Sequence, residues 1–161
     1  MHLAPQEVRT YFVTTVTASR RRLFQVHENA ELLIGTLQDQ RSKGRIMLHS
    51  FVVMPDHVHF ILTPAPEVSL EKAMQYIKGG FSFRLKSKID VWQRSYDNRR
   101  ILDSEDFAER TRYIHENPVR AHIASRAEEY LFSSAGREHL IDPPPHHLSQ
   151  WAEAGSEKAR G

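Results

Sequence analysis

The sequence has no cysteine among its 161 residues. This excludes a disulfide framework and any zinc site with cysteine ligands, and it is typical of a cytoplasmic protein. No apolar run approaches the roughly 20 residues that a membrane span requires, and the first residues lack the pattern of a secretory signal. The sequence also lacks a large excess of either sign of charge, because it has 22 basic and 20 acidic residues. We therefore expect a cytoplasmic protein that does not enter a membrane, and the pI near 9.0 only mildly favours a polyanionic partner.

Residue patterns predict four β-strands. The segment 11–17 (YFVTTVT) is rich in aromatic and β-branched residues, which favours a strand. Segments 46–54 and 57–63 have the same character and are separated by a Pro-Asp turn, so we expect them to form a hairpin. A fourth strand is predicted over 91–100.

Helical spacing of apolar residues predicts three helices. The first two are expected over 27–41 and 70–85, and the third over 104–117, where the following proline ends it. Gly79 and Gly80 lie inside the second helix, and each costs about 1 kcal/mol relative to alanine. This pair predicts either a bend in the helix or a neighbour that packs unusually close.

The resulting order, β-α-β-β-α-β and then a helix, is the ferredoxin-like (split β-α-β) pattern of an α+β fold. It predicts an antiparallel sheet with helices on one face, the other face being open for a ligand. We assign this domain to residues 1–135. From Gly136 the pattern fades, and three consecutive prolines at 143–145 predict an extended, mobile C-terminal tail over 136–161.

His57 and His59 are separated by one residue on the predicted third strand. Because side chains alternate along a strand, both project from the same face, about 6.6–7 Å apart along the chain. Val58 and Phe60 then point the other way, toward the helices. Two imidazoles on an open sheet face can bind one divalent ion. The pair by itself is equally compatible with two histidines on a half-buried surface that bind nothing.

Tyr113 and Asn117 are four residues apart on the last predicted helix, so they share a face about one turn apart. A tyrosine that attacks a phosphodiester needs the charge of its target phosphate relieved, which a metal ion does as a Lewis acid. Asn117 is placed to give that ion an oxygen ligand beside the nucleophile. Two imidazoles and an amide suit Mg²⁺ or Mn²⁺. The alternative is that Tyr113 packs at the edge of the core and Asn117 only terminates the helix.

The chain from residue 49 to 135 resembles the HUH-type single-tyrosine transposases, and within them the REP-associated tyrosine transposases of the IS200-like group. Five segments carry the resemblance: 49–59 (HSFVVMPDHVH), 76–82 (YIKGGFS), 91–94 (VWQR), 113–121 (YIHENPVRA) and 130–135 (YLFSSA). The sequence departs from the usual pattern at Asp56, His122 and Phe132, where Asn, Gly and Trp are common. These departures concern substrate preference rather than the type of reaction.

The resemblance implies a metal-dependent enzyme that nicks single-stranded DNA and transfers the strand. His57, His59 and Asn117 would bind the metal, and Tyr113 would form a covalent 5′-phosphotyrosine and free a 3′-OH. The implied partner is single-stranded DNA with imperfect hairpins. Whether the protein acts as a monomer or a homodimer is left open.

Basic residues near these motifs are candidates for contact with backbone phosphates, although solvated helix faces look alike in sequence. The candidates are Lys78, Arg84, Lys86, Arg99, Arg100 and Arg120. The rival nucleophiles are Tyr11, Tyr76, Tyr96 and Tyr130. Two other functions remain open: a non-catalytic module that binds single strands or hairpins, and a metal phosphoesterase in which water attacks and Tyr113 only positions the substrate.

Overall fold

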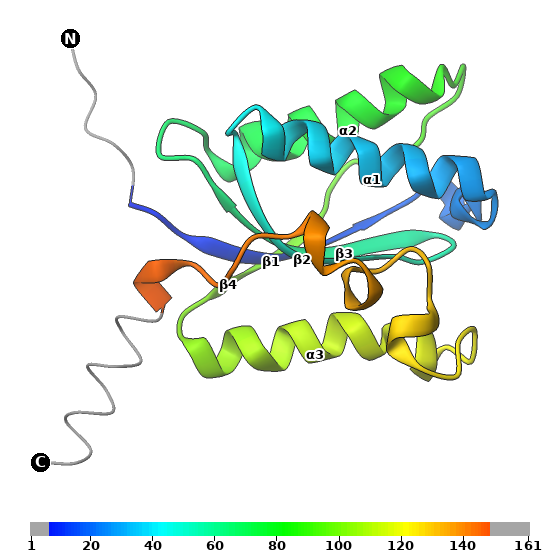
Figure 1. The fold of residues 1–161 in the computed structure, drawn as a ribbon. Helices are drawn as coiled ribbons and strands as arrows, with labels where there is room; N and C mark the ends of the chain where they lie inside the picture. The colour runs from blue at the N-terminus through cyan, green and yellow to red at the C-terminus, as the bar shows by residue number, and fades with distance from the viewer. Residues whose placement is uncertain (1–6, 149–161) are drawn as a thin grey trace, which may run out of the picture.

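A four-stranded sheet and three α-helices form the body of the computed structural model, which describes residues 7–148 (Figure 1). Five single-turn 3₁₀ helices lie in the connections. The elements are β1 (Thr10–Val16), α1 (His27–Ser42), β2 (Ile46–Val53), β3 (His57–Pro64), α2 (Leu70–Leu85), β4 (Asp97–Ile101) and α3 (Ser104–Arg120). Within the described residues, no helix has both the length and the apolar character needed to cross a membrane.

All neighbouring strands of the sheet are antiparallel, in the order β2-β3-β1-β4. This is the order that the ferredoxin-like pattern predicts, so the predicted fold class and the β2–β3 hairpin are confirmed. The two central strands, β1 and β3, pair so that His59 lies opposite Thr14 and His57 opposite Val16. Both histidines therefore lie on a central strand of the sheet, next to β1.

The helices α1 and α2 cover one face of the sheet (Figure 1). Val58, Phe60 and Leu62 of β3 point into this layer and are fully buried, each stabilising the fold by about 1.5–3 kcal/mol. Where α2 crosses α1, a Cβ atom at Gly80 would lie 3.3 Å from the Cγ2 atom of Thr36. Gly80 thus marks a close approach between two helices, whereas a Cβ atom at Gly79 would have no such neighbour within 4 Å, and α2 continues through both glycines.

The third helix, α3, lies on the opposite face of the sheet (Figure 1). Its buried side chains Phe107 and Ile114 pack against Val52 of β2 and Ile61 of β3. The face that the sequence left open for a ligand is therefore partly covered. What remains accessible is the part of this face around the first residues of β3.

The last predicted strand and the end of α3 differ from expectation. The predicted strand 91–100 is paired only over Asp97–Ile101, because Val91 and Trp92 are both buried and leave the alternation of a strand. Trp92 forms an isolated bridge with Thr17 instead. The helix α3 continues past Asn117 to Arg120, with Pro118 in its last turn. A proline there removes only one backbone donor, and the chain closes the turn with later N–H groups.

Residues 136–148 pack against the domain, unlike the extended tail expected from Gly136 onward. The Asp142 carboxylate accepts a hydrogen bond from the Leu48 backbone at 2.8 Å and pairs with Arg41 at 3.1 Å. The His49 ring lies 2.9 Å from the Pro143 carbonyl, and Leu148 is buried. The rest of the predicted tail, 149–161, lies outside the described residues, and the domain boundary at 135 stays a prediction.

Candidate functional site

A cavity of about 400 Å³ opens on the second face of the sheet, where the C-terminal half of α3 passes the ends of β1 and β3. It contains the predicted nucleophile and all three predicted metal ligands. The lining residues are Thr14, Val16, Arg20, His57, His59, Tyr113, Asn117, Arg120 and Ala121. Residues that are more than 50 positions apart in the sequence therefore meet in one place.

Local structure explains why these side chains converge. The alternation of β3 places His57 and His59 on the face opposite Val58, and their ring centroids are 4.8 Å apart. Ile114 is fully buried under α3 and fixes the rotation of the helix. Tyr113 and Asn117, one turn apart, then lie at the edge of α3 that borders the histidine pair.

Both histidine rings are oriented by a hydrogen bond at Nδ1. The His57 Nδ1 lies 2.7 Å from the Asp56 Oδ1, and Arg20 in turn pairs with Asp56 at 3.3 Å. The His59 Nδ1 lies 2.8 Å from the Thr14 hydroxyl. These contacts leave the lone pair of the Nε2 atom of each ring free to bind a metal. This is the usual arrangement of metal-binding histidines and their supporting residues.

The donor set fits a divalent metal only if the amide takes part. Within residues 7–148, no group of three or more His, Cys, Asp or Glu side chains is arranged to hold a metal ion. Asn117 shares the cavity with the histidine pair and can supply a side-chain oxygen as a third ligand. Two imidazoles and one amide oxygen would leave coordination positions for water or a phosphate.

His59 is kept neutral by its surroundings. Its side chain is only 6% exposed, stacks on Phe12 with ring centroids 5.5 Å apart, and meets the Tyr113 ring edge-on at 5.6 Å. Burial, with smaller contributions from the charges of His57 and Arg120, lowers the pKa of His59 from 6.5 to about 3. Neutral imidazole is the form that binds a metal, so the site does not have to lose a proton from His59 at neutral pH.

Tyr113 is 39% exposed and reaches the cavity from its rim. Its ring meets Phe12 edge-on at 5.9 Å, which fixes the direction of the side chain. The Arg120 guanidinium lies 4.4 Å from the ring centroid and donates a hydrogen bond to the Tyr113 carbonyl at 2.7 Å. A phenol accessible to solvent therefore has a permanent cation beside it.

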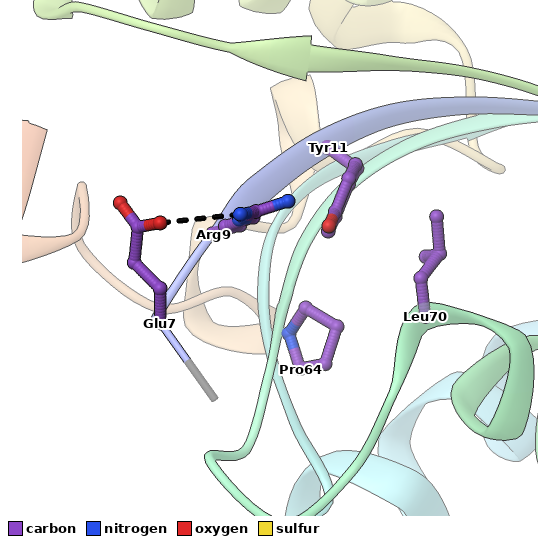
Figure 2. A pocket seen from close by; sticks show the side chains of 5 residues that line it. All are labelled: Glu7, Arg9, Tyr11, Pro64 and Leu70. Atoms are coloured by element: carbon purple, nitrogen blue, oxygen red, sulfur yellow. Dashed lines mark hydrogen bonds and ion pairs between the residues drawn. The ribbon is translucent and has the colours of Figure 1, made fainter. Parts of the chain in front are cut away.

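The rival tyrosines lie elsewhere. The Tyr130 hydroxyl donates to the Val53 carbonyl at 2.6 Å, and burial raises its pKa to about 12. Tyr11 packs against the layer of α1 and α2 and lines a separate cavity of about 200 Å³. Figure 2 shows Tyr11 there, beside the ion pair of Arg9 and Glu7. Tyr76 and Tyr96 also lie outside the cavity of the histidine pair.

The six basic candidates do not form one surface. Of the six, Arg120 alone lines the cavity, and its guanidinium also pairs with Glu116 at 3.6 Å. Three others are held in ion pairs: Arg99 with Asp106, Arg100 with Glu7, and Arg84 with Asp39.

The remaining two basic candidates belong to α2, on the other face of the sheet. Lys78 is directed at the Gln93 carbonyl, to which it donates at 2.9 Å, and burial lowers its pKa. Lys86 is exposed at the end of the helix. Neither of these two lysines lines the cavity.

Four further residues of the site have roles that the sequence patterns did not indicate. Asp56 and Thr14 orient the two histidines, Arg20 holds Asp56, and Phe12 supports both His59 and Tyr113. The position of Asp56 directly before His57 could have indicated its role. The roles of Thr14 and Phe12 depend on the register between β1 and β3, which no local pattern reveals.

Comparison with known proteins identifies the family. A family model described as "Transposase IS200 like" matches residues 7–117, a range that includes both histidines, Tyr113 and Asn117. The chain belongs to the IS200-like transposase family. It is 24% identical over 130 residues to the REP-associated tyrosine transposase of Escherichia coli K12, covering 80% of this chain and 78% of that protein.

Solved structures of this group share the fold. The structure of a REP-associated tyrosine transposase bound to a REP hairpin matches with a TM-score of 0.69 and 21% identity, covering 89% of this chain and 87% of the other. A Deinococcus radiodurans R1 protein described as a transposase matches with a TM-score of 0.52 and 24% identity, covering 73% and 95%. The resemblance seen in the sequence is thus confirmed for this IS200-like transposase, and so is the α+β fold.

Proposed function

We propose that this IS200-like transposase cuts and rejoins single-stranded DNA through a covalent 5′-phosphotyrosine on Tyr113. The observation that carries the proposal is the shared cavity of Tyr113, Asn117, His57 and His59. Membership of the family supports a DNA-processing enzyme in transposition. The contacts of the cavity support the particular residues and their roles.

His57, His59 and Asn117 would hold Mg²⁺ or Mn²⁺. Asp56 and Thr14 fix the rotation of the two rings, and the low pKa of His59 keeps that imidazole unprotonated. When bound, the ion would supply Lewis-acid polarisation of a phosphate oxygen.

Tyr113 is the nucleophile in this proposal. Its Oη atom bonds to the phosphorus, the bond from phosphorus to the 3′ oxygen breaks, and that oxygen leaves as a 3′-OH after taking a proton from solvent. The phenol proton passes to water, which the 39% exposure of Tyr113 permits. In the second step a 3′-OH from another strand attacks the phosphotyrosine, which restores the tyrosine and joins the strands.

Arg120 would contact the phosphate under attack. Its guanidinium lies beside the Tyr113 ring at the rim of the cavity, so a phosphate within reach of the hydroxyl is also near this cation. A fixed cation at the point where negative charge develops lowers the barrier of such a reaction. Of the six predicted DNA contacts, Arg120 is the one that the position of the cavity favours for the reacting phosphate.

The substrate would be single-stranded DNA beside an imperfect hairpin. A related transposase of the same fold has been solved bound to a REP hairpin. The two rivals, a non-catalytic binding module and a phosphoesterase that uses water, differ from the proposal in one product. Only the tyrosine mechanism leaves protein covalently attached to DNA.

The test is to incubate the protein and Mg²⁺ or Mn²⁺ with a labelled single-stranded hairpin substrate, and to look for an adduct that resists denaturation. We expect an adduct with the native protein and with Tyr76→Phe, a matched control outside the cavity, and none with Tyr113→Phe. Nicking without an adduct would favour attack by water, and binding without nicking would favour the non-catalytic module. An equal adduct in Tyr113→Phe would refute the assignment of the nucleophile.

A further inference from the structure

An exposed aromatic side chain lies near the end of α2, outside the cavity. Phe83 is 84% exposed, and Ile89, six residues later, is 63% exposed. The same helix buries Ile77 and Phe81 completely. Two large apolar side chains this exposed within one short segment mark a candidate binding surface.

The loop that carries these side chains has a defined shape. Lys86 ends α2 in the left-handed conformation (φ 55°), which turns the chain sharply. The Ser87 hydroxyl donates to the Ile89 carbonyl at 2.7 Å and accepts from the Ile89 N–H at 3.2 Å. Phe83, Lys86, Lys88 and Ile89 are thus displayed around one hydrogen-bonded turn.

This loop is joined to the segment that leads to the cavity. The Ala18 N–H donates to the Val91 carbonyl at 2.8 Å, and the Arg21 guanidinium donates to the Asp90 carbonyl. Arg20, the next residue to Arg21, lines the cavity with the histidine pair. In Figure 1 the end of α2 and the segment after β1 lie at the same end of the sheet.

Positive charge is concentrated on these two joined segments, whereas the whole chain is nearly balanced. The segments are residues 18–26 and 83–94, and their only carboxylate is Asp90. Their basic residues are Arg20, Arg21, Arg22, Arg84, Lys86, Lys88 and Arg94. Arg20 and Arg84 are paired with carboxylates elsewhere in the fold. Among the described residues, the exposed side chains of Arg22, Lys86, Lys88 and Arg94 have no carboxylate partner. We call these four residues, with Phe83 and Ile89, the basic edge.

We infer that the basic edge binds the single-stranded DNA that leads into the cavity, with Phe83 stacking on an unpaired base. This inference rests on the proposed function and adds a path for the substrate. Aromatic side chains between cations are the usual way to bind single strands, because every base has a flat face and every nucleotide a phosphate. A second copy of the chain is a poor occupant, since a two-fold contact would bring the same four cations face to face.

The experiment compares a hairpin that has single-stranded flanks with the same hairpin without flanks, in fluorescence anisotropy with a chelator present. We expect Phe83→Ala to weaken binding of the flanked hairpin about tenfold, and to leave the unflanked hairpin unaffected. Phe83→Trp, which keeps an aromatic ring, should bind the flanked hairpin with the affinity of the native protein. Leu131→Ala, at another exposed apolar residue (60% exposed), is the matched control and should change neither.

Two further measurements locate the contacts. Abasic sites placed one at a time in the flanks should reveal one position at which loss of the base weakens DNA binding by the native protein. The same abasic site should not weaken binding by Phe83→Ala further, because that variant already lacks the stacking contact. Lys88→Gln should reduce the slope of log affinity against log salt by about 0.7, the value for one phosphate of a single strand. Lys72→Gln, in the first turn of the same helix, should leave the slope unchanged.

Several outcomes would overturn the inference: equal affinity of Phe83→Ala and native protein for the flanked hairpin, or equal losses on both hairpins. A native dimer that Phe83→Ala dissociates in sedimentation, with DNA affinity intact, would make this surface an interface between copies. The adduct assay keeps the two proposals apart. A native protein that forms the Tyr113 adduct while Phe83→Ala binds normally overturns this inference alone. Flank-dependent binding through Phe83 without any adduct overturns the proposed function alone.

Discussion

His59 makes the stability of the fold depend on pH in a way that can be calculated. Burial lowers its pKa from 6.5 to about 3 in the folded protein. Between these values the unfolded chain binds a proton that the folded chain does not, so the free energy of unfolding falls as the pH falls below 6.5. From pH 7 to pH 5 the loss from His59 is about 2 kcal/mol, because each pKa unit corresponds to about 1.4 kcal/mol.

The assay is urea unfolding at pH 7 and pH 5, both above the ordinary pKa values of Asp and Glu, with a chelator to remove metal. A loss of about 2 kcal/mol moves the urea midpoint by about 1 M. His49, His115 and His147 also have pKa values lowered by burial, so the native protein should lose more than His59 alone contributes. The His59→Gln variant, which keeps a polar group near Thr14 but does not titrate, isolates the contribution of His59.

We expect the native protein to lose about 2 kcal/mol more between pH 7 and pH 5 than His59→Gln does. His139→Gln, at an exposed histidine, is the control and should decline like the native protein. If His59→Gln shows the same decline as the native protein, the imidazole is not held neutral by burial. Burial would then not be the reason that His59 is ready to bind a metal at neutral pH.

Three further predictions follow from the site and its surroundings. Arg120→Gln should slow adduct formation about 100-fold on a normal phosphate, and have little effect on a neutral methylphosphonate at the scissile position; equal losses on both would contradict a contact with phosphate charge. Asp56→Ala should weaken Mn²⁺ binding in calorimetry by about 10- to 100-fold, whereas Asp56→Asn, which still accepts from His57, should change it much less; equal effects would argue against orientation of the ring. Asp142→Ala should lower the free energy of unfolding by about 1–3 kcal/mol in urea, because the Leu48 N–H loses its side-chain acceptor; unchanged stability would show that residues 136–148 are not anchored there.

The N-terminal ends of the helices and the histidine pair show which features local sequence patterns can predict. Ser69 and Asp103 cap α2 and α3, accepting from backbone N–H groups at 3.0 and 2.8 Å, and both residue types favour this position. Alternation along β3 was enough to place His57 and His59 on one face, and helical spacing was enough to place Tyr113 beside Asn117. Each of these placements depends on a repeat within a single element, which is why the sequence could predict it.

The end of the domain shows which features local sequence patterns do not predict. Three prolines and a loss of periodicity predicted a mobile tail from Gly136, but Asp142 and Leu148 are held by β2 and by the α3 side of the sheet. Likewise, α3 covers part of a face that the sequence left open. A segment without periodicity can still be fixed by side-chain contacts with residues nearly a hundred positions away.

The sequence by itself determined the type and order of the elements, the face of β3 that carries the histidines, and the pairing of a tyrosine with an amide on one helix. The tertiary structure decided that α3 lies on the histidine face, that Thr14 lies opposite His59, and that Arg99, Arg100 and Arg84 are held in ion pairs. The physical reason is the separation along the chain over which each effect acts. Backbone periodicity acts over a few residues, whereas sheet order, register and ion pairing depend on how distant segments pack, which a single local pattern does not encode.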